Sequence, residues 1–144
     1  MIGYAFCGSH CTLSHSLAAL RRLRAGGVDV LPIFSERVAA TDTRFWKAAD
    51  FRETVETMCG RRCISSIVEA EPLGPVTPLD ALVIAPCTGN TLAKMAQGIT
   101  DSAVTMAAKA HLRCDRPTLI ALASNDSMSA NLANIATLLG RKQV

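Results

Sequence analysis

Four short polar segments of the chain carry the side chains that could bind a ligand, and each directly follows an apolar run. They are residues 8–12, 35–43, 88–91 and 124–131. Glycine, hydroxyl and amide groups dominate these segments, and such groups hydrogen-bond to anions and to planar polar rings. The residue types therefore favour binding of a phosphorylated or aromatic small molecule.

The third segment is the most informative, because an apolar run leads directly into it and a helix is predicted to follow. The apolar run is typical of a strand buried on both faces, and Pro86 is expected to end it because proline has no N–H for the ladder. Thr88 and Asn90 are good helix caps, and Gly89 lets a ligand approach the backbone. Thr88, Asn90 and Thr91 are candidate ligand contacts, although Thr88 could instead only satisfy its own turn.

The first segment, Gly8 to Thr12, is a glycine turn that leads into a predicted helix. Its backbone N–H groups, its two hydroxyls and the positive end of the helix dipole would suit a phosphate. The segment lacks the three glycines of a dinucleotide-binding fingerprint and the Gly-Lys-Ser/Thr of a P-loop, so it favours a monophosphate over a pyrophosphate. His10 could contact that phosphate or act as an acid or base.

The second and fourth segments contribute further candidates, each with a structural alternative. The candidates are Ser35, Thr41, Asp42 and Thr43 in the second segment, and Ser124, Asn125, Asp126, Ser127, Met128, Ser129 and Asn131 in the fourth. Thr43 and Asp101 would equally suit helix caps, and Asn125 and Asp126 a turn. We favour a shared ligand site, because all four polar segments are predicted at one edge of a sheet.

The composition predicts one globular domain. The chain has 144 residues, of which 49% are hydrophobic and 19% charged, so it can bury a core without disulfides or a metal. None of the six cysteines has C-x-x-C spacing, and we expect reduced, packed thiols and no metal site. Cys87 is either a reactive thiolate or, as we favour, a packed thiol.

The charge pattern gives no sign of nucleic-acid binding. The net charge is only +3, and Arg21, Arg22 and Arg24 are expected on a solvated helix face without interleaved aromatic residues. His15 and His111 are expected at the surface or in helix packing. Since no signal peptide or membrane span is recognisable, we expect a cytoplasmic protein.

Strand-like and helix-like runs alternate along the chain, which predicts an α/β fold with a mostly parallel sheet. The predicted strands are 2–7, 28–34, 64–68, 80–85 and 118–123. A first helix is predicted from a start signal at Thr12 or Ser14 to a stop at Gly26 and Gly27, and a second over 44–58. Three more have apolar helical faces within 92–99, 104–112 and 128–139. Residues 35–43 and the proline-rich segment 69–78 are predicted loops. In such a sheet the loops at the carboxyl ends of the strands converge on one site.

The long motif over residues 85–101 resembles a known flavin-binding loop. Its sequence, Ala-Pro-Cys-Thr-Gly-Asn-Thr-Leu-Ala-Lys-Met-Ala-Gln-Gly-Ile-Thr-Asp, is similar to that of the flavoprotein family that includes phosphopantothenoylcysteine decarboxylase and the lantibiotic cysteine decarboxylases. Residues 8–12, 41–45, 66–75 and 124–126 resemble one branch of it, the B subunits of dipicolinate synthases from spore-forming bacteria. The likeness extends from Ile2 to about Leu139.

The resemblance implies a three-layer α/β/α, flavodoxin-like (Rossmann-like) domain over residues 1–144 that binds FMN. It places the FMN phosphate at Gly8, Ser9, His10 and Ser35, the isoalloxazine ring at Pro86, Thr88, Asn90 and Thr91, and the substrate at Asn125, Asp126 and Met128. It assigns no catalytic residue.

Two departures from the family pattern qualify what the resemblance implies. The decarboxylases carry a catalytic histidine near the end of their third strand, and residues 65–78 contain none, so cysteine decarboxylation is not expected. The chain is also expected to lack a C-terminal strand and helix that the family normally has.

The implied activity is that of an oxidoreductase subunit that helps to form dipicolinic acid from a dihydrodipicolinate-type precursor during sporulation, in the cytoplasm of the mother cell. The implied partner is the A subunit, which resembles a nicotinamide-dependent dehydrogenase and would hold NADP, in a homo- or hetero-oligomer. The alternative is a non-catalytic scaffold that holds FMN or substrate for the A subunit.

Overall fold

A four-stranded, all-parallel sheet forms the centre of the computed structural model, which describes all 144 residues. The strands are β1 (Ile2–Phe6), β2 (Val30–Phe34), β3 (Leu82–Thr88) and β4 (Thr118–Ala123), in the order β2-β1-β3-β4. This order is that of a doubly wound, flavodoxin-like sheet. The predicted fold class is confirmed.

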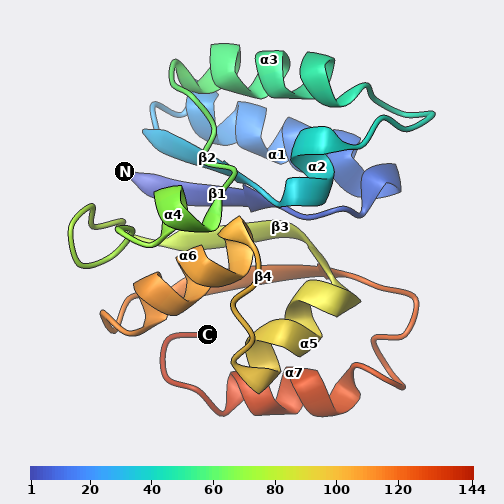
Figure 1. Cartoon of the computed structure of the whole chain (residues 1–144), viewed down its shortest axis with the longest axis vertical. Helices are drawn as coiled ribbons and strands as arrows, with labels where there is room; N and C mark the ends of the chain where they lie inside the picture. The colour runs from blue at the N-terminus through green and yellow to red at the C-terminus, as the bar shows by residue number, and fades with distance from the viewer.

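Helices cover both faces of the sheet and make it a three-layer α/β/α domain (Figure 1). They are η1 (His10–Thr12), α1 (Leu13–Ala25), α2 (Glu36–Ala40), α3 (Ala48–Cys59), α4 (Ile67–Ala70), α5 (Gly89–Gln97), α6 (Ala103–Leu112) and α7 (Leu132–Leu139). In Figure 1 the strands run across the middle, with α1 and α3 above them and α5 and α7 below.

The alternation of side chains along the strands divides the core into two clusters. Tyr4 and Phe6 of β1 belong to a cluster of 13 buried residues that includes α1 and α3 side chains. Ala5 and Cys7 belong to a cluster of 17 buried residues that includes α5 and α6 side chains. Successive strand residues point to opposite faces, so one strand anchors both helical layers.

The prediction of a strand over residues 64–68 is wrong. Ile64 makes only an isolated parallel bridge to Ile33, and α4 begins three residues later. The Ser66 hydroxyl accepts a hydrogen bond from the N–H of Glu69 (3.3 Å), and the Glu69 carboxylate accepts one from the N–H of Ser66 (3.1 Å). This reciprocal capping box starts a helix, and the segment therefore leaves the sheet.

Pro86 does not end its strand as predicted, because β3 continues to Thr88. The pairing with β4 shifts register between Ile84 and Cys87, and Pro86 lies inside this shift, where a missing ladder donor is tolerated. Its carbonyl still accepts a hydrogen bond from the N–H of Cys7 (3.1 Å). The strand therefore delivers Thr88 directly to the start of α5.

The predicted loop over residues 35–43 contains the short helix α2, and the helix predicted at 44–58 is α3, which begins at Ala48. Ser35 caps α2, since its hydroxyl accepts a hydrogen bond from the N–H of Val38 (3.4 Å). The Asp42 carboxylate accepts one from the N–H of Ala48 (2.9 Å). Asp42 thus binds the first backbone N–H of α3 from six residues away.

Two predicted surface features are also corrected. Arg24 is not a solvated side chain, because its guanidinium donates hydrogen bonds to the carbonyls of Val28 (2.6 Å) and Met58 (3.0 Å). Cys11 is exposed rather than packed, although all six cysteines are free thiols. None of the helices combines the length and the apolar character needed to cross a bilayer.

Candidate functional site

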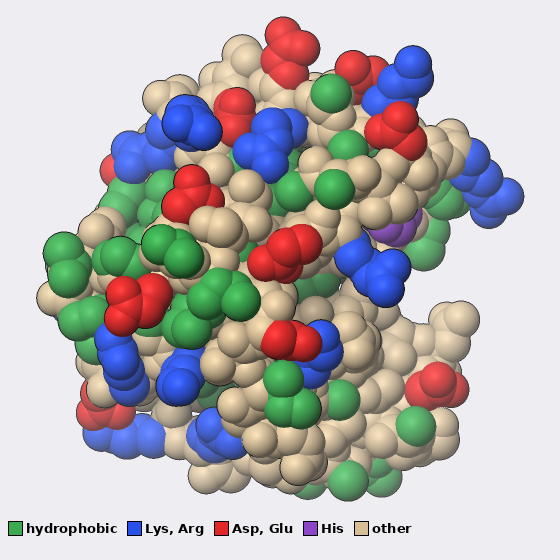
Figure 2. Space-filling view, viewed as in Figure 1, with side chains coloured by type: hydrophobic (Ala, Val, Ile, Leu, Met, Phe, Trp, Pro, Cys, Tyr) green, Lys and Arg blue, Asp and Glu red, His purple; other side chains and the backbone are tan.

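A cavity of about 460 Å³ opens at the carboxyl edge of the sheet, and we call it the polar cavity. It is lined by Gly8, Ser35, Glu36, Arg37, Thr88, Asn90, Thr91, Lys94, Asp101 and Ser102, none of which is hydrophobic. Figure 2 shows the surface hollowed between α2 and the loop that follows β4. A site with this lining would bind a polar or charged group.

The topology of the sheet explains why these residues meet. Gly8 follows β1, Ser35 follows β2, and Thr88 is the last residue of β3. Neighbouring parallel strands end at the same edge, so their loops lie side by side, and ligands of doubly wound sheets bind there. Convergence of the first three polar segments is therefore a consequence of the strand order.

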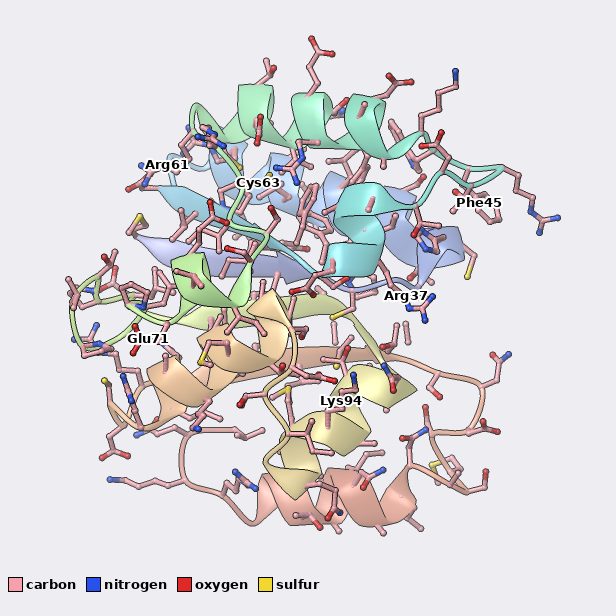
Figure 3. The ribbon with its side chains drawn as sticks, in the orientation of Figure 1. Arg37, Phe45, Arg61, Cys63, Glu71 and Lys94 are labelled. Atoms are coloured by element: carbon pink, nitrogen blue, oxygen red, sulfur yellow. The ribbon has the colours of Figure 1, made fainter.

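Arg37 is the cation of the polar cavity that has no partner in the chain. Lys94 Nζ donates hydrogen bonds to both carboxylate oxygens of Asp101 (2.9 and 2.7 Å), which lowers the pKa of Asp101. The Glu36 carboxylate accepts a hydrogen bond from the N–H of Ala103 (2.9 Å), at the start of α6. Arg37 has no hydrogen-bonded or ionic partner in the chain, and Figure 3 shows it on the α2 side of the cavity, opposite Lys94.

Gly8 lies between two basic side chains. A Cβ built on Gly8 would come within 3.5 Å of His10 Nε2 and within 3.6 Å of Arg37 Cβ. The N–H of Gly8 donates no hydrogen bond within the chain, and neither does the Arg37 guanidinium. This corner of the polar cavity offers an anion a backbone donor and an unpaired positive charge.

The start of α5 adds free backbone donors to the site. The Thr88 hydroxyl accepts a hydrogen bond from the N–H of Thr91 (3.2 Å) and donates one to the Thr91 hydroxyl (3.1 Å). Thr88 is therefore a helix cap, which was the alternative to a ligand contact, and it also lines the cavity. The N–H groups of Gly89 and Asn90 belong to the first helical turn, which has no intrahelical acceptor.

The loop after β4 reaches the site at Gly89. A Cβ on Gly89 would lie 2.7 Å from Asn131 Nδ2 and 3.1 Å from Ser124 Oγ, so the absence of a side chain allows this close approach. The Asn131 amide donates a hydrogen bond to the Ser124 hydroxyl (3.2 Å), which ties the two ends of the loop together. The fourth polar segment thus meets the third.

Five of the eight residues predicted to bind the cofactor line the polar cavity, namely Gly8, Ser35, Thr88, Asn90 and Thr91. Three do not. The Ser9 hydroxyl accepts a hydrogen bond from the Thr12 hydroxyl (2.9 Å), His10 lies beside Gly8, and Pro86 is buried in β3.

The three predicted substrate residues are on the loop after β4 and do not line the polar cavity. Asp126 donates its backbone N–H to the Ser124 hydroxyl (3.2 Å), which is the turn-forming role considered above. Met128 is 83% exposed, and Asn125 is exposed on the same loop. They lie at the carboxyl edge of the sheet but outside the cavity.

Sequence reasoning missed the charged lining of the polar cavity. Arg37, Lys94 and Glu36 were not singled out, and Asp101 was considered only as a cap or a ligand. These residues could have been found by their closeness in sequence to predicted site residues. Arg37 stands two residues after Ser35, and Lys94 lies inside the flavin-loop motif.

Cys87 is a packed thiol, as favoured above, and not a reactive thiolate. Its side chain is fully buried, and a hydrogen bond with Cys7 together with burial raises the pKa of Cys87 far above its ordinary value. Cys87 therefore stays protonated beneath the site.

Comparison with known proteins identifies the family. A family model described as Flavoprotein matches residues 4–139. The B subunit of the dipicolinate synthase of Bacillus subtilis (strain 168) is 41% identical over 143 residues, which cover 99% of this chain and 72% of that protein.

Solved structures agree with this match. The crystal structure of the dipicolinate synthase B subunit from Bacillus halodurans C superposes with a TM-score of 0.87 at 39% identity, over 99% of this chain and 73% of that one. The FMN-dependent cysteine decarboxylase SpaF superposes with a TM-score of 0.74 at 25% identity, over 96% and 78% of the two chains. Through the family match and the 41% identical relative, the chain belongs to the Flavoprotein family.

Proposed function

We propose that this chain binds FMN, with the phosphate in the polar cavity, and serves as the B subunit of a dipicolinate synthase. In this role it would help to oxidise a dihydrodipicolinate-type precursor to dipicolinate in a sporulating mother cell. The observation that carries the proposal is the unpaired Arg37 beside Gly8 and Ser35, at the edge where doubly wound folds bind ligands.

The Arg37 corner of the polar cavity fits a phosphate. An anion there would receive hydrogen bonds from the N–H of Gly8 and from the Arg37 guanidinium, whose planar fork matches phosphate oxygens. Lys94 and Asp101 already neutralise each other, and the Glu36 carboxylate accepts a hydrogen bond from the N–H of Ala103 at the start of α6. Arg37 is therefore the cation of this lining that is free to bind a negative charge.

The rest of the lining fits the sugar-alcohol chain of FMN better than its ring. Asn90, Thr91 and Ser102 offer hydroxyl and amide groups, and no apolar side chain lines the cavity. We therefore assign the phosphate and ribityl chain to the polar cavity. The ring needs an apolar surface outside it, and Met128, at the same edge of the sheet and 83% exposed, is a side chain that could provide one.

Aromatisation of a dihydropyridine ring removes a hydride equivalent and a proton, and bound FMN is a group that can accept the hydride. The chain's residues would bind and orient this group through Arg37, Gly8 and the first turn of α5. The two relatives that are B subunits of dipicolinate synthases support this choice of reaction over the decarboxylation named for SpaF.

One observation favours a second candidate, a scaffold that binds FMN or substrate without catalysing the reaction. The carboxylates that line the polar cavity, Glu36 and Asp101, already accept hydrogen bonds from the chain, and Lys94 is paired. No free acid or base of this chain lines the cavity, so the proton acceptor would come from the substrate or from the dehydrogenase-like A subunit with its NADP.

The first experiment is an absorbance spectrum of the purified chain before and after denaturation. We expect flavin bands that move into the supernatant on denaturation, or that appear after incubation with FMN and removal of the excess. A chain that stays colourless after this incubation contradicts the proposal.

The second experiment separates the catalytic role from the scaffold. Dipicolinate formation is measured with the A subunit and NADP, alone, with the flavin-free chain, and with this chain loaded with FMN. The catalytic role predicts turnover only with the FMN-loaded chain, and a scaffold predicts the same rate with both. Unchanged turnover without the chain would remove both roles.

A further inference from the structure

An exposed apolar surface lies on α4 and on the loop 71–78 that follows it, and we call it the α4 patch. Val68 of α4 is 82% exposed, and Val76 of the loop is 75% exposed. Pro75 and Pro78 are exposed on the same loop. Figure 2 shows apolar side chains gathered around α4 and this loop, on the left of the molecule. Contiguous apolar patches on the surface of a protein mark sites of interaction.

The loop 71–78 is held in place, so the exposed position of Val76 is fixed. The N–H of Val76 donates a hydrogen bond to the Pro72 carbonyl (3.1 Å). Leu73 is buried in the core and anchors the loop there. A Cβ on Gly74 would clash with the carbonyl oxygen of Ala110, so the loop lies directly against α6. A surface that is already ordered loses little conformational freedom when it binds.

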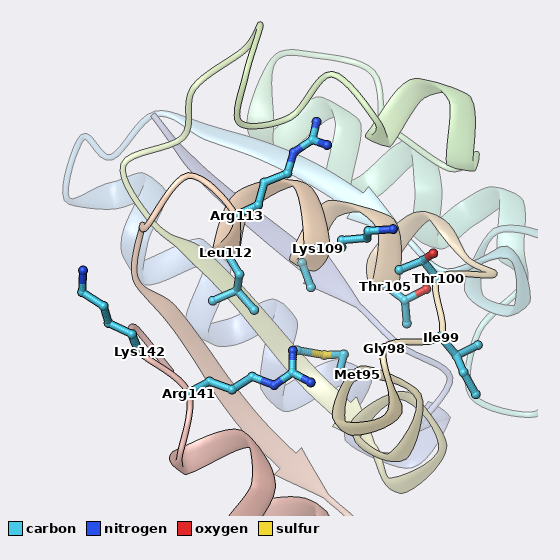
Figure 4. A pocket seen from close by; sticks show the side chains of 11 residues that line it. Met95, Gly98, Ile99, Thr100, Thr105, Lys109, Leu112, Arg113, Arg141 and Lys142 are labelled. Atoms are coloured by element: carbon cyan, nitrogen blue, oxygen red, sulfur yellow. The ribbon is translucent and has the colours of Figure 1, made fainter.

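Unpaired charges of both signs border the α4 patch. Glu71 follows α4 directly, and no ion pair or hydrogen bond engages its carboxylate. Lys109 and Arg113 are exposed on α6, the helix that the loop contacts, and neither has a partner in the chain. Figure 4 shows Arg113 extending from α6 away from the cavity of about 380 Å³ between α5, α6 and the tail after α7. One surface of the molecule therefore carries apolar side chains, a free carboxylate and free cations.

We propose that the α4 patch is the surface at which two copies of this chain associate about a two-fold axis. In a two-fold contact the same surface meets itself, so each contact between two different residues occurs twice. Glu71 of each copy would pair with Lys109 and Arg113 of the other copy. Val68 and Val76 would be buried between the copies, and burial of their apolar surface would favour the association.

Charge complementarity distinguishes the α4 patch from the other exposed apolar side chains. Leu132 and Leu139 of α7 are 51% and 67% exposed, but α7 contains no charged residue, so nothing on that surface selects an occupant. At the α4 patch this chain supplies both of the charges that must meet. A second copy therefore satisfies the surface without any other component.

The α4 patch lies away from the polar cavity. In Figure 3, Glu71 is on the left of the molecule, whereas Arg37, which lines the cavity, is on the right. Association through the α4 patch therefore leaves the cavity open to a ligand. The inference does not depend on FMN binding, and its test is made without flavin.

The test is analytical ultracentrifugation of the purified chain at concentrations up to the millimolar range. We expect reversible association of two chains. Val68→Asp and Val76→Asp should each weaken this association by at least about tenfold, because the new carboxylate would be buried at the contact. Leu139→Asp, the same kind of change on α7, is the matched control and should leave the association unchanged.

Charge exchange tests the pairing itself. Glu71→Lys alone, and Lys109→Glu together with Arg113→Glu, should each weaken association by at least about tenfold, because like charges would then meet. An equal mixture of these two variants should associate about as tightly as the unaltered chain, because opposite charges meet again in each contact. Arg21→Glu with Arg22→Glu, on the exposed face of α1, is the matched control and should associate normally.

A chain that stays monomeric at millimolar concentration would overturn the proposal. Association that the Leu139 variant abolishes, or that the Val68 and Val76 variants leave unaltered, would place the contact on another surface and would also overturn it. So would assembly into trimers alone, because a two-fold contact joins chains in pairs. Thermal unfolding shows whether each variant is folded, and a mixture of two folded charge variants that does not associate would contradict the pairing of Glu71 with Lys109 and Arg113.

Discussion

Gly8 and Arg37 meet at the mouth of the polar cavity, where a Cβ on Gly8 would lie 3.6 Å from Cβ and 3.9 Å from Cδ of Arg37. The absent side chain leaves the N–H of Gly8 and the Arg37 guanidinium open to the same anion. The segments after β1 and after β2 thus form a single corner of the polar cavity because their strands are neighbours in the sheet.

The first prediction concerns the charge of this corner. Arg37→Gln should weaken FMN binding by about tenfold to a hundredfold, since hydrogen bonds to charged groups contribute about 1.5–3 kcal/mol. Riboflavin, which lacks the phosphate, should bind the variant and the unaltered chain equally. Quenching of flavin fluorescence measures both affinities, with Arg21→Gln as the control for net charge. An equal loss of affinity for FMN and for riboflavin in the Arg37 variant would contradict a phosphate at this corner.

The second prediction concerns the contact between α5 and the loop after β4. Gly89→Ala should destabilise the fold by about 1–2 kcal/mol, because the new methyl group displaces Asn131 and breaks its hydrogen bond to Ser124. Gly140→Ala is the matched control, since its Cβ would meet nothing closer than 3.5 Å. Urea unfolding compares the two, and equal stability of both variants would contradict the close approach.

The third prediction uses the Lys94–Asp101 pair. Hydrogen bonding by Lys94 lowers the pKa of Asp101 from its ordinary value of 3.8. The ionised carboxylate therefore stabilises the fold above that pH, and the contribution is lost as the pH falls through the lower value of the folded state. Tm of the Asp101→Asn variant should depend less on pH below about pH 4 than Tm of the unaltered chain. Added salt should reduce this difference between the two chains, because the ion pair is exposed. If Tm of the variant and Tm of the unaltered chain fell equally with pH, the Lys94–Asp101 pairing would be contradicted.

The fourth prediction concerns His111, which is fully buried on α6. Burial lowers the pKa of His111 from 6.5, while Nε2 forms a 2.9 Å hydrogen bond with the Pro117 carbonyl. His111 therefore binds a proton more readily in the unfolded chain than in the folded chain. The folded state loses stability as the pH drops below 6.5. His111→Gln should show a smaller decrease in Tm between about pH 7.5 and about pH 5. An unchanged decrease would show that His111 does not carry this dependence.

Much of the fold was predictable because local patterns and tertiary packing agree. Leucines at helical spacing, with a start signal at Thr12 or Ser14 and a stop at Gly26, predict a first helix, and the structure has α1 at Leu13–Ala25. The segment after Cys63 was predicted wrongly because its apolar residues suit a strand, whereas the Ser66–Glu69 capping box selects a helix. A three-residue spacing of serine and glutamate was the signal for that helix, and it was overlooked.

The site was predictable to the extent that strand ends define it. Gly8, Ser35 and Thr88 could be placed together from the alternation of strands and helices alone. Arg37 and Lys94 could not, because their contributions depend on which charges have partners, and those partners come from other elements. Asp101 neutralises Lys94 from the segment just before α6, while Arg37 is left alone.

The measurement that tests the central claim most directly is a paired titration of the flavin-free chain with FMN and riboflavin. The account predicts saturable FMN binding at least about tenfold tighter than riboflavin binding, and a shift of the Gly8 amide with FMN only. Equal affinities for the two flavins, or FMN binding that leaves the Gly8 amide unmoved, would contradict a phosphate site in the polar cavity.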